Sequence, residues 1–539
     1  MRAAGAGQLG ALALIATACV LTSNPSLGAT DSSRAAPAGT VGGATRFNLD
    51  EIRIEGNTLL PATEIEAAVY PFLGPDRTAD DIEQARVALD ALYNKRGFPT
   101  VSAEIPRQRV TDGVVTLKVT ERSVGRLRVT GSRYFSLDAI RNRAPSLAEG
   151  RVPNIHRVEQ DIQALNQQPG RSVTPVLQAG RAPGTVDVDL VVSDKFPAHG
   201  SIELNNRTSA GTTALRLSGA VGYDNLWQRG DSVSAFFQVA PQRPKDALVF
   251  STSYLFHIPD TNLSLLASYL KSDSNVTSVG STNVIGKGQI LGARLLIPLT
   301  SDGFFSQTLS VGIDYKDFEQ NLTLAGTGSS VPLQYYPAIA TYQANWTGDG
   351  QQTDLTGNFV FGPRGIGSGN AVFDQNRYRA LPNFYYVRAA LAHTHDLPHE
   401  VQFWARAQTQ ISPDLIVANE QFSVGGQDAV RGYYESEVLG DNGASLQMEM
   451  RSPSLATAFG LPAVNELRFY AFSDLGYAAI NNPLPEQRRS YALNSAGVGV
   501  RLRLFDRFSG ALENATALTD GPTTKTGTNR VLFRLFGDF

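Results

Sequence analysis

The pattern of hydrophobic and polar positions changes once along the 539-residue chain, near residue 198. Before that point, segments with apolar residues three or four positions apart alternate with segments in which every second residue is apolar. After it, only the second pattern remains, in segments of about ten residues. Helices place every third or fourth residue on one face, and strands place every second residue on one face. The sequence therefore predicts an α/β region followed by an all-β region.

Residues 47–121 are predicted to form a compact unit in the order β-α-α-β-β. Its longer helix begins at a capping box formed by Thr78 and Asp81, whose side chains satisfy free backbone N–H groups of the first turn. The apolar face of this helix is expected to carry Ile82, Ala85, Leu89 and Leu92, and strands are expected at residues 50–55, 101–105 and 114–119.

The same order repeats in residues 122–196. Gly56-Asn57 and Gly131-Ser132 mark equivalent turns about 75 residues apart, and that spacing equals the length of one unit. We therefore expect two tandem α/β modules, the first module (47–121) and the second module (122–196). The second module is expected to contain strands at 127–129, 173–178 and 186–192, and helices at 137–143 and 158–165.

Residues 197–539 contain about sixteen alternating segments, and sixteen is an even number, as in bacterial outer-membrane barrels. One segment turns Val498 and Val500 to one face and Gly499 and Arg501 to the other. No stretch after residue 30 is apolar for the ~18 residues that a membrane-spanning helix needs, so insertion into a membrane requires a closed barrel. Short connections are expected at 257–260, 396–399 and 505–506, and long ones at 272–284, 362–382 and 412–440.

The first 29 residues have the features of a secretory signal peptide. Arg2 is followed by an apolar segment at residues 9–21 and by small residues up to Ala29. The single cysteine, Cys19, lies in this segment; as a lipid-attachment site it would lack the usual leucine three positions earlier. Residues 30–46 are small and flexible, as in a linker. The net charge of −3 gives no indication of nucleic-acid binding.

One stretch of the all-β region combines paired glycines, a cation and aromatic residues: Val430-Arg431-Gly432-Tyr433, preceded by Gly425-Gly426. Glycines allow the chain to turn back tightly, and an arginine can hold such a turn with several hydrogen bonds. The stretch predicts a sharply folded loop tied down by Arg431 inside the barrel. An ordinary surface hairpin with a solvated arginine is the alternative.

Two sets of residues resemble known families. The modules resemble polypeptide-transport-associated (POTRA) domains, notably at Gly56-Asn57-Thr58-Leu59-Leu60 and Tyr93-x-x-x-Gly97-Phe98. The β region resembles the barrel of the haemolysin secretion/activation proteins, the outer-membrane transporters of two-partner secretion, in a superfamily that includes the barrel-assembly machinery. The resemblance implies a transmembrane antiparallel β-barrel of about sixteen strands, preceded by two small α/β POTRA domains.

The resemblance also assigns roles to particular residues. Val430, Arg431, Gly432 and Tyr433 resemble the family's tetrapeptide at the tip of its sixth outer loop, and Phe472, Asp474 and Gly476 resemble its barrel-wall motif. In that family the loop folds into the lumen and its arginine pairs with the wall aspartate. Alternation in residues 467–476 independently turns Phe472 and Asp474 inward. The terminal aromatic residue, Phe539, is expected to signal insertion into the membrane.

The expected function is export of a large unfolded secreted protein with an N-terminal secretion domain. The expected location is the bacterial outer membrane, with the modules in the periplasm, membrane lipid around the barrel, and the barrel-assembly machinery needed for insertion. No catalytic residue, cofactor or metal is expected. The modules are expected to capture the cargo by strand addition at residues 114–119, beside the helix face at 80–95. Many family members carry a plug helix, for which residues 30–46 are too short, so the sixth loop is expected to close the resting pore.

Other functions remain open at this point. An assembly factor that inserts other barrels is the main alternative, and a passive porin is the next. An outer-membrane lipase or protease lacks a Gly-x-Ser-x-Gly motif in its favour. His393, His395 and His399 could hold a metal but lack a surrounding cluster of acidic or thiol ligands. Residues 362–369 are rich in glycine but lack the ending of a phosphate-binding loop.

Overall fold

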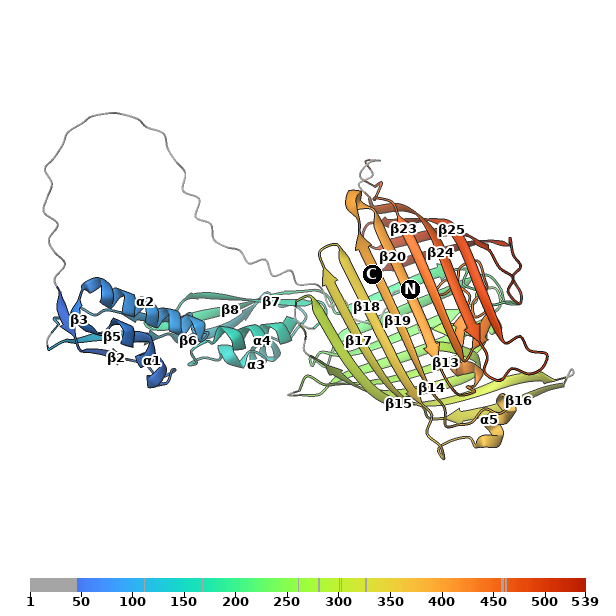
Figure 1. Cartoon of the computed structure of the whole chain (residues 1–539), viewed down its shortest axis with the longest axis horizontal. Helices are drawn as coiled ribbons and strands as arrows, with labels where there is room; N and C mark the ends of the chain where they lie inside the picture. The colour runs from blue at the N-terminus through green and yellow to red at the C-terminus, as the bar shows by residue number, and fades with distance from the viewer. Residues whose placement is uncertain are drawn as a thin grey trace. The chain divides into compact units, whose positions relative to one another are not determined.

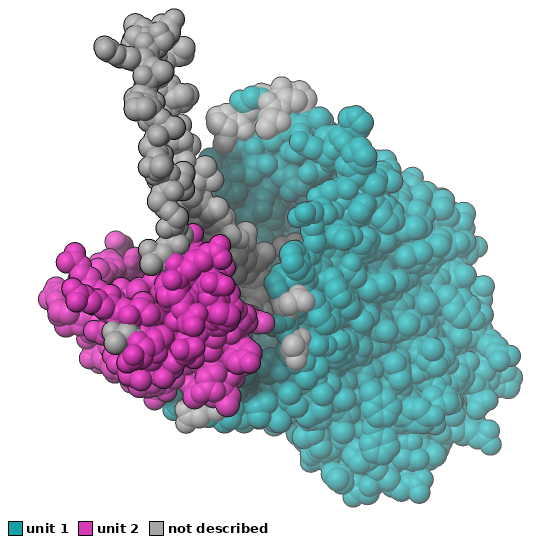
Figure 2. All heavy atoms as spheres, turned by 60° about the vertical axis from the view of Figure 1, so that its left-hand side comes forward, with its two compact units in different colours: residues 1–8, 197–539 teal, residues 9–196 magenta. Residues whose placement is uncertain are grey.

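The computed structural model describes residues 46–539, except for short gaps at 111, 167, 260, 280–281, 300, 302, 325–326, 457–459 and 461–462. The predicted signal peptide (1–29) and residues 30–45 of the predicted linker lie outside the described residues. The chain forms two compact units that meet in sequence between Phe196 and Pro197, coloured separately in Figure 2. Within the described part of the chain, no helix has the length and apolar character needed to cross a membrane.

The first module has the predicted β-α-α-β-β order. The capping box of its long helix is present, with the backbone N–H of Thr78 donating to Asp81 over 2.8 Å. The structure also contains a two-stranded sheet that the sequence pattern did not predict. In this sheet, residues 47–49, before the first strand, pair with residues 74–77, after the first helix. The elements are β1 (Phe47–Leu49), β2 (Glu51–Glu55), α1 (Ala62–Val69), β3 (Gly74–Arg77), α2 (Ala79–Lys95), β4 (Val101–Glu104) and β5 (Val114–Glu121).

The expectation that residues 114–119 form an exposed sheet edge is wrong. The strand order of the first module is β2-β5-β4, so β5 lies in the centre, parallel to β2 and antiparallel to β4. Val115, Leu117 and Val119 face the module's core, as do Val101 and Ala103 of the edge strand β4, so burial alone does not distinguish a central strand from an edge strand. Pairing with β2 on one side and β4 on the other leaves β5 without a free edge.

The second module repeats this arrangement with the order β6-β8-β7. Gly56 and Gly131 occupy equivalent turns, and both have a positive φ, of +89° and +86°. A Cβ atom would lie 2.3 Å from the carbonyl oxygen of Val119 in the first case and 2.4 Å from that of Val192 in the second. The elements are β6 (Ser123–Thr130), α3 (Leu137–Asn142), α4 (Ile155–Asn166), β7 (Arg171–Ala179) and β8 (Thr185–Asp194).

Residues 197–539 form a closed antiparallel barrel (Figure 1). Its first strand, β9, pairs with both β10 and the last strand, β27. Both β16 and β17 pair with β15, so they are two parts of one strand interrupted at Tyr336-Pro337. The barrel therefore has the predicted sixteen strands. The strands are β9 (Ala198–Asn205), β10 (Arg216–Leu226), β11 (Asp231–Val239), β12 (Leu248–His257), β13 (Ser264–Val279), β14 (Thr282–Pro298), β15 (Phe305–Leu324), β16 (Thr327–Tyr335), β17 (Ala338–Gly348), β18 (Gln351–Phe361), β19 (Tyr385–Asp396), β20 (Gln402–Ile411), β23 (Asn442–Arg451), β24 (Val464–Ala479), β25 (Ser490–Leu504), β26 (Phe508–Ala517) and β27 (Asn529–Asp538).

Alternation along the strands separates an apolar outer face from a polar inner face. On β24, Phe469 is 52% exposed while its neighbours Tyr470 and Phe472 are buried. The prediction of a long loop at 272–284 is wrong, because β13 continues to Val279 and β14 begins at Thr282. Strand residues beyond the lipid need no apolar face, so this polar hairpin has the composition of a loop. The long connection between β18 and β19 contains α5 (Asn370–Asn376), and another long connection joins β20 to β23.

The two equivalent glycines predict a graded effect on stability. Gly131→Ala is expected to lower the free energy of unfolding of a fragment spanning residues 46–196 by about 2 kcal/mol or more, because it combines a left-handed conformation with a close backbone contact. Urea denaturation followed by circular dichroism measures this change. Gly150→Ala is the control, since its φ is +84° but nothing lies within 4 Å of the added atom; its expected cost is about 1 kcal/mol. Equal losses of unfolding free energy in the two variants would contradict the predicted clash between the added Cβ atom and the carbonyl oxygen of Val192.

Candidate functional site: the loop between β20 and β23

Residues 412–441 connect β20 to β23 and lie against the inner face of the barrel wall. The loop contains a one-turn helix, η5 (Ala418–Glu420), and a two-stranded stem of β21 (Phe422–Val424) and β22 (Val438–Gly440). Its contacts on the wall include Gln447, Glu449 and Asp474, which alternate with residues on the outer face. The loop therefore lies on the lumen side of the wall.

Glycines shape the tip of this loop. Gly425, Gly426 and Gly432 have φ angles of +107°, +95° and +92°. A Cβ atom on Gly426 would lie 2.3 Å from the carboxylate of Glu435, which accepts a hydrogen bond from the backbone N–H of Gln427 over 3.0 Å. The paired glycines thus let the two arms of the tip approach each other closely.

Arg431 makes a bidentate contact with Asp474 of β24. Its Nε donates to one carboxylate oxygen over 2.8 Å and its Nη2 to the other over 2.7 Å. The backbone N–H of Arg431 donates to the same aspartate over 2.9 Å. Arg431 is 2% exposed and Asp474 is fully buried. Paired, charge-assisted hydrogen bonds of this kind are strong and fix direction.

Two further carboxylates, which sequence reasoning did not assign to the site, complete the surroundings of Arg431. Its Nη1 donates to Glu449 of β23 over 2.7 Å and to Glu513 of β26 over 3.0 Å. The guanidinium also stacks on the ring of Phe472, 3.6 Å from its centroid. Alternation places Glu449 on the polar face of its strand, but nothing in the sequence shows which inward carboxylates meet.

The charges around Arg431 balance. Glu449 also pairs with Arg451 over 2.6 Å and with Arg501 over 3.7 Å, and Glu513 accepts from the hydroxyl of Tyr470 over 2.7 Å. Three arginines therefore face three carboxylates. We call Arg431 and its partners Asp474, Glu449 and Glu513 the arginine clamp.

The other motif residues fit the loop to the wall. A Cβ atom on Gly476 would lie 2.4 Å from a methyl group of Val424 and 2.5 Å from one of Val430, so a larger residue would displace the loop. The hydroxyl of Tyr433 lies 2.7 Å from the carbonyl oxygen of Thr519, beyond β26. Gly432 approaches the backbone of β26, with Ala517 N 3.5 Å from its notional Cβ. The structure thus brings Val430, Arg431, Gly432, Tyr433, Phe472, Asp474 and Gly476 together.

Arg207 holds the same tip from another direction and was also missed by sequence reasoning. It follows β9 and forms ion pairs with Asp428 and with Glu435, the latter over 3.2 Å. The tip is therefore attached to the first barrel strand as well as to β23, β24 and β26. No local pattern marks Arg207, which stands in a polar stretch of sequence.

Phe539 lies apart from the loop, at the seam between the first and last strands. Its backbone N–H donates to the carbonyl oxygen of Gly200 over 2.9 Å, and the N–H of Gly200 donates back over 3.1 Å. Its ring contacts Phe508 edge-to-face and is 64% exposed. The terminal residue thus extends the pairing that closes the barrel.

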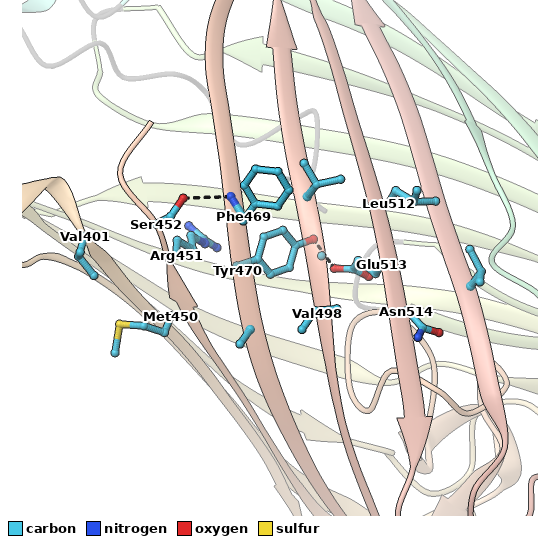
Figure 3. A pocket seen from close by; sticks show the side chains of 14 residues that line it. Val401, Met450, Arg451, Ser452, Phe469, Tyr470, Val498, Leu512, Glu513 and Asn514 are labelled. Atoms are coloured by element: carbon cyan, nitrogen blue, oxygen red, sulfur yellow. Dashed lines mark hydrogen bonds between the residues drawn. The ribbon is translucent and has the colours of Figure 1, made fainter. Parts of the chain in front are cut away.

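A hollow of about 740 Å³ lies near the clamp but on the other side of the wall (Figure 3). Its apolar lining includes Met450, Phe469, Val498 and Leu512, all about half exposed on the outer face. Outward residues dominate the lining, so the hollow belongs to the outer surface and not to the lumen.

The histidines considered as metal ligands form a different arrangement. His393 and His395 stack with their ring centroids 5.9 Å apart, and Thr353 lies 2.8 Å from the Nδ1 atom of His393. Across the residues that the structure describes, no group of three or more histidine, cysteine or acidic residues is placed to hold a metal ion.

The fold defines an outer-membrane β-barrel with a POTRA region in the periplasm. A family model described as "Haemolysin secretion/activation protein ShlB/FhaC/HecB" matches residues 184–502, and one described as "POTRA domain, ShlB-type" matches residues 47–122. The chain belongs to this haemolysin secretion/activation family, the transporters of two-partner secretion, each of which acts with a secreted partner protein. The family is one of secretion pores and is not known for catalysis.

Individual relatives agree with this assignment. The chain is 25% identical over 446 residues to the outer membrane transporter CdiB of Escherichia coli, covering 80% of this chain and 72% of that protein. It is 20% identical over 483 residues to the heme/hemopexin transporter protein HuxB of Haemophilus influenzae, covering 88% and 83%. A solved structure of CdiB from Escherichia coli has the same fold, with a TM-score of 0.64 at 21% identity, covering 94% of this chain and 93% of that one.

The arginine clamp predicts unequal effects of removing its members. Arg431→Ala leaves three carboxylates crowded together, whereas Asp474→Ala leaves Arg431 with two partners; breaking a buried pair costs about 3–5 kcal/mol. In a Cys19→Ser background, the rate at which a maleimide labels Val424→Cys reports release of the loop, since Val424 is 1% exposed. We expect at least a tenfold faster rate with Arg431→Ala and a smaller increase with Asp474→Ala.

A cysteine in place of the exposed Trp227 is the control and should react equally in every background. Equal rates at position 424 in the two clamp variants would mean that Glu449 and Glu513 do not contribute to holding the loop.

Proposed function

We propose that the protein exports one large, unfolded secreted partner whose N-terminal secretion domain binds the two modules. In this proposal the second module is a POTRA domain like the first, and the loop at 412–441 closes the resting lumen. Counted from β9, this loop is the sixth connection at the end of the barrel opposite the modules' point of attachment. The observation that carries the proposal is the buried arginine clamp, which holds a 30-residue loop inside the barrel.

The clamp explains how a closed pore is maintained and released. Confining a loop of this length lowers its conformational entropy, and the hydrogen bonds of Arg431 offset that loss. The wall keeps most of its own pairing when Arg431 leaves, because Glu449 retains Arg451 and Glu513 retains Tyr470. Release of the loop therefore leaves Asp474 as the main group without its partner. Folding of the cargo outside the cell would then prevent its return.

Cargo capture by strand addition requires a sheet edge with free backbone groups, and the β4 edge of the first module is protected. On β4, the backbone N–H of Ala103 donates to Asp90 of α2 over 2.7 Å, and its carbonyl oxygen accepts from Arg86. Beyond the end of β4, the side-chain amide of Gln108 covers the edge of β5. It donates to the carbonyl oxygen of Thr116 and accepts from the N–H of the same residue, each over 2.7 Å. Such contacts are typical of edges protected against strand addition.

The corresponding edge of the second module is more open at its far end. Asn166 bonds the N–H and carbonyl group of Val173, and Pro175 has no N–H to offer. Outward backbone groups recur every second residue along β7, so those of Leu177 come next. Val176 and Leu177 are 39% and 46% exposed, which adds apolar surface to the free edge. We therefore place cargo capture at this end of β7.

The first prediction for export concerns the clamp. Arg431→Ala is expected to reach the outer membrane at the wild-type level and to reduce secretion of the partner at least tenfold. Asp474→Ala should reduce it less, and the double variant should secrete no less than Arg431→Ala, because the residues act through one cluster. Immunoblotting of culture supernatants measures secretion. Arg364→Ala, which removes an exposed arginine of another loop, is the control; wild-type secretion by Arg431→Ala would overturn the role of the loop.

The second prediction concerns capture of the cargo. Leu177→Pro removes the outward N–H group at a position where proline is sterically acceptable, as the natural Pro175 shows. We expect secretion to fall at least fivefold with the barrel still inserted. Leu177→Ala, which keeps the N–H group, separates backbone pairing from apolar contact and should retain more than half of the wild-type level. If both substitutions leave secretion unchanged, the cargo binds elsewhere on the modules.

A further inference from the structure

A second buried charge attaches the same loop to a different part of the wall. The carboxylate of Glu420, which is 1% exposed, accepts from the Lys316 ammonium over 2.6 Å. It also accepts from the hydroxyl groups of Tyr335 over 2.6 Å and Tyr386 over 2.7 Å. These donors come from β15, β16 and β19, none of which belongs to the arginine clamp.

The backbone and the neighbours of Glu420 strengthen this attachment. Its carbonyl oxygen accepts from the amide of Gln410 over 3.1 Å. Ile416 and Val417, both fully buried, pack in an apolar cluster with Phe318, Phe384 and other wall residues. A charged group with three donors inside an apolar cluster is fixed in position, because any displacement leaves buried polar groups unpaired.

Asp441 joins the two ends of the loop into one base. Its carboxylate pairs bidentately with Arg377, which follows α5, and accepts from the backbone N–H groups of Ile416 over 3.2 Å and Asn481 over 2.8 Å. Residues 412–421 and Asp441, which we call the base, are therefore held together. The stem of β21 and β22 separates the base from the tip that carries Arg431.

The base and the tip differ in what their release leaves behind. At the tip, Glu449 and Glu513 keep other partners when Arg431 leaves, and the buried Asp474 loses its ion pair. At the base, Lys316 forms its ion pair with Glu420 over 2.6 Å. Lys316 is itself buried, with 7% of its surface exposed. Departure of Glu420 would remove the ion-pair partner of this ammonium and the shared acceptor of two buried tyrosine hydroxyls, and the nearby carboxylate of Asp314 is already paired with Arg294 over 2.9 Å. Departure of the base therefore leaves a charge and two hydroxyl groups without their partners, whereas departure of the tip leaves one carboxylate.

We propose that Glu420 is a positioning residue, which keeps the base fixed while the tip moves after Arg431 releases it. We call this fixed attachment of Glu420 to Lys316, Tyr335 and Tyr386 the mount. This proposal rests on the proposed function, in which the loop closes the pore. The base stays attached to β15, β16 and β19 during export, and it returns the tip to its place afterwards. The clamp and the mount therefore control different steps, opening and closing.

Single-channel recording of the purified full-length protein in planar bilayers separates these steps. Arg431→Ala is expected to raise the opening rate at least tenfold and to change the closing rate less than twofold. Glu420→Gln, which loses the charge and keeps the shape, is expected to lower the closing rate at least fivefold. Tyr386→Phe removes one of three donors and should lower the closing rate two- to threefold, which keeps the test available if Glu420→Gln inserts poorly.

Charge exchange tests the pair itself. Lys316→Glu and Glu420→Lys should each slow closing, and the combination should restore the closing rate to within twofold of wild type. Glu400→Gln, in the exposed turn between β19 and β20, is the control. An increased opening rate in Glu420→Gln that matches Arg431→Ala would show that the base leaves with the tip and would overturn the proposal.

The two proposals fail in different ways. If Arg431→Ala changes neither gating nor export, the loop does not close the pore and the proposed function is at fault. If Arg431→Ala behaves as expected but Glu420→Gln gates like wild type, only the mount is wrong.

Discussion

The loop in the lumen depends on the burial of one arginine against the barrel wall. Removing a guanidinium from water is costly unless its hydrogen bonds are replaced in good geometry. Arg431 meets this condition with Asp474, Glu449 and Glu513, which come from three strands, and with the ring of Phe472. Because the partners come from three strands of the run β23-β24-β25-β26, the contact forms only once these strands are paired. The position of the loop therefore depends on the pairing of this part of the barrel.

Close approach of the loop to the wall depends on residues without side chains. Gly476 leaves space for Val424 and Val430, and Gly497 leaves space for the ring of Phe472, which a Cβ atom would approach to 2.4 Å. These glycines lie in strands, where the lack of a side chain ordinarily weakens the sheet. Their presence is explained by what packs over them, which is the loop and the aromatic residue beneath Arg431.

The attachments of the loop divide it into parts with different roles. The base packs in an apolar cluster beside Glu420, and at the tip Glu449 and Glu513 keep other partners when Arg431 leaves, while Asp474 loses its ion pair. Arg207 adds a contact from the end of β9. In the proposed function, a loop with one fixed and one releasable attachment opens the pore and then returns to its place.

The sequence alone determined the α/β region and the sixteen-stranded barrel that follows it, because these follow from local periodicity, in which one residue's face fixes its neighbours' faces. It also marked Arg431 through the motif that carries the family resemblance. Only the tertiary structure decided that β5 is a central strand and that Glu449, Glu513, Arg207 and Glu420 hold the loop. These facts depend on which strands become neighbours and how far a loop reaches across the lumen. Periodicity shows which way a side chain points, but the pairing of distant strands decides which residues that side chain contacts.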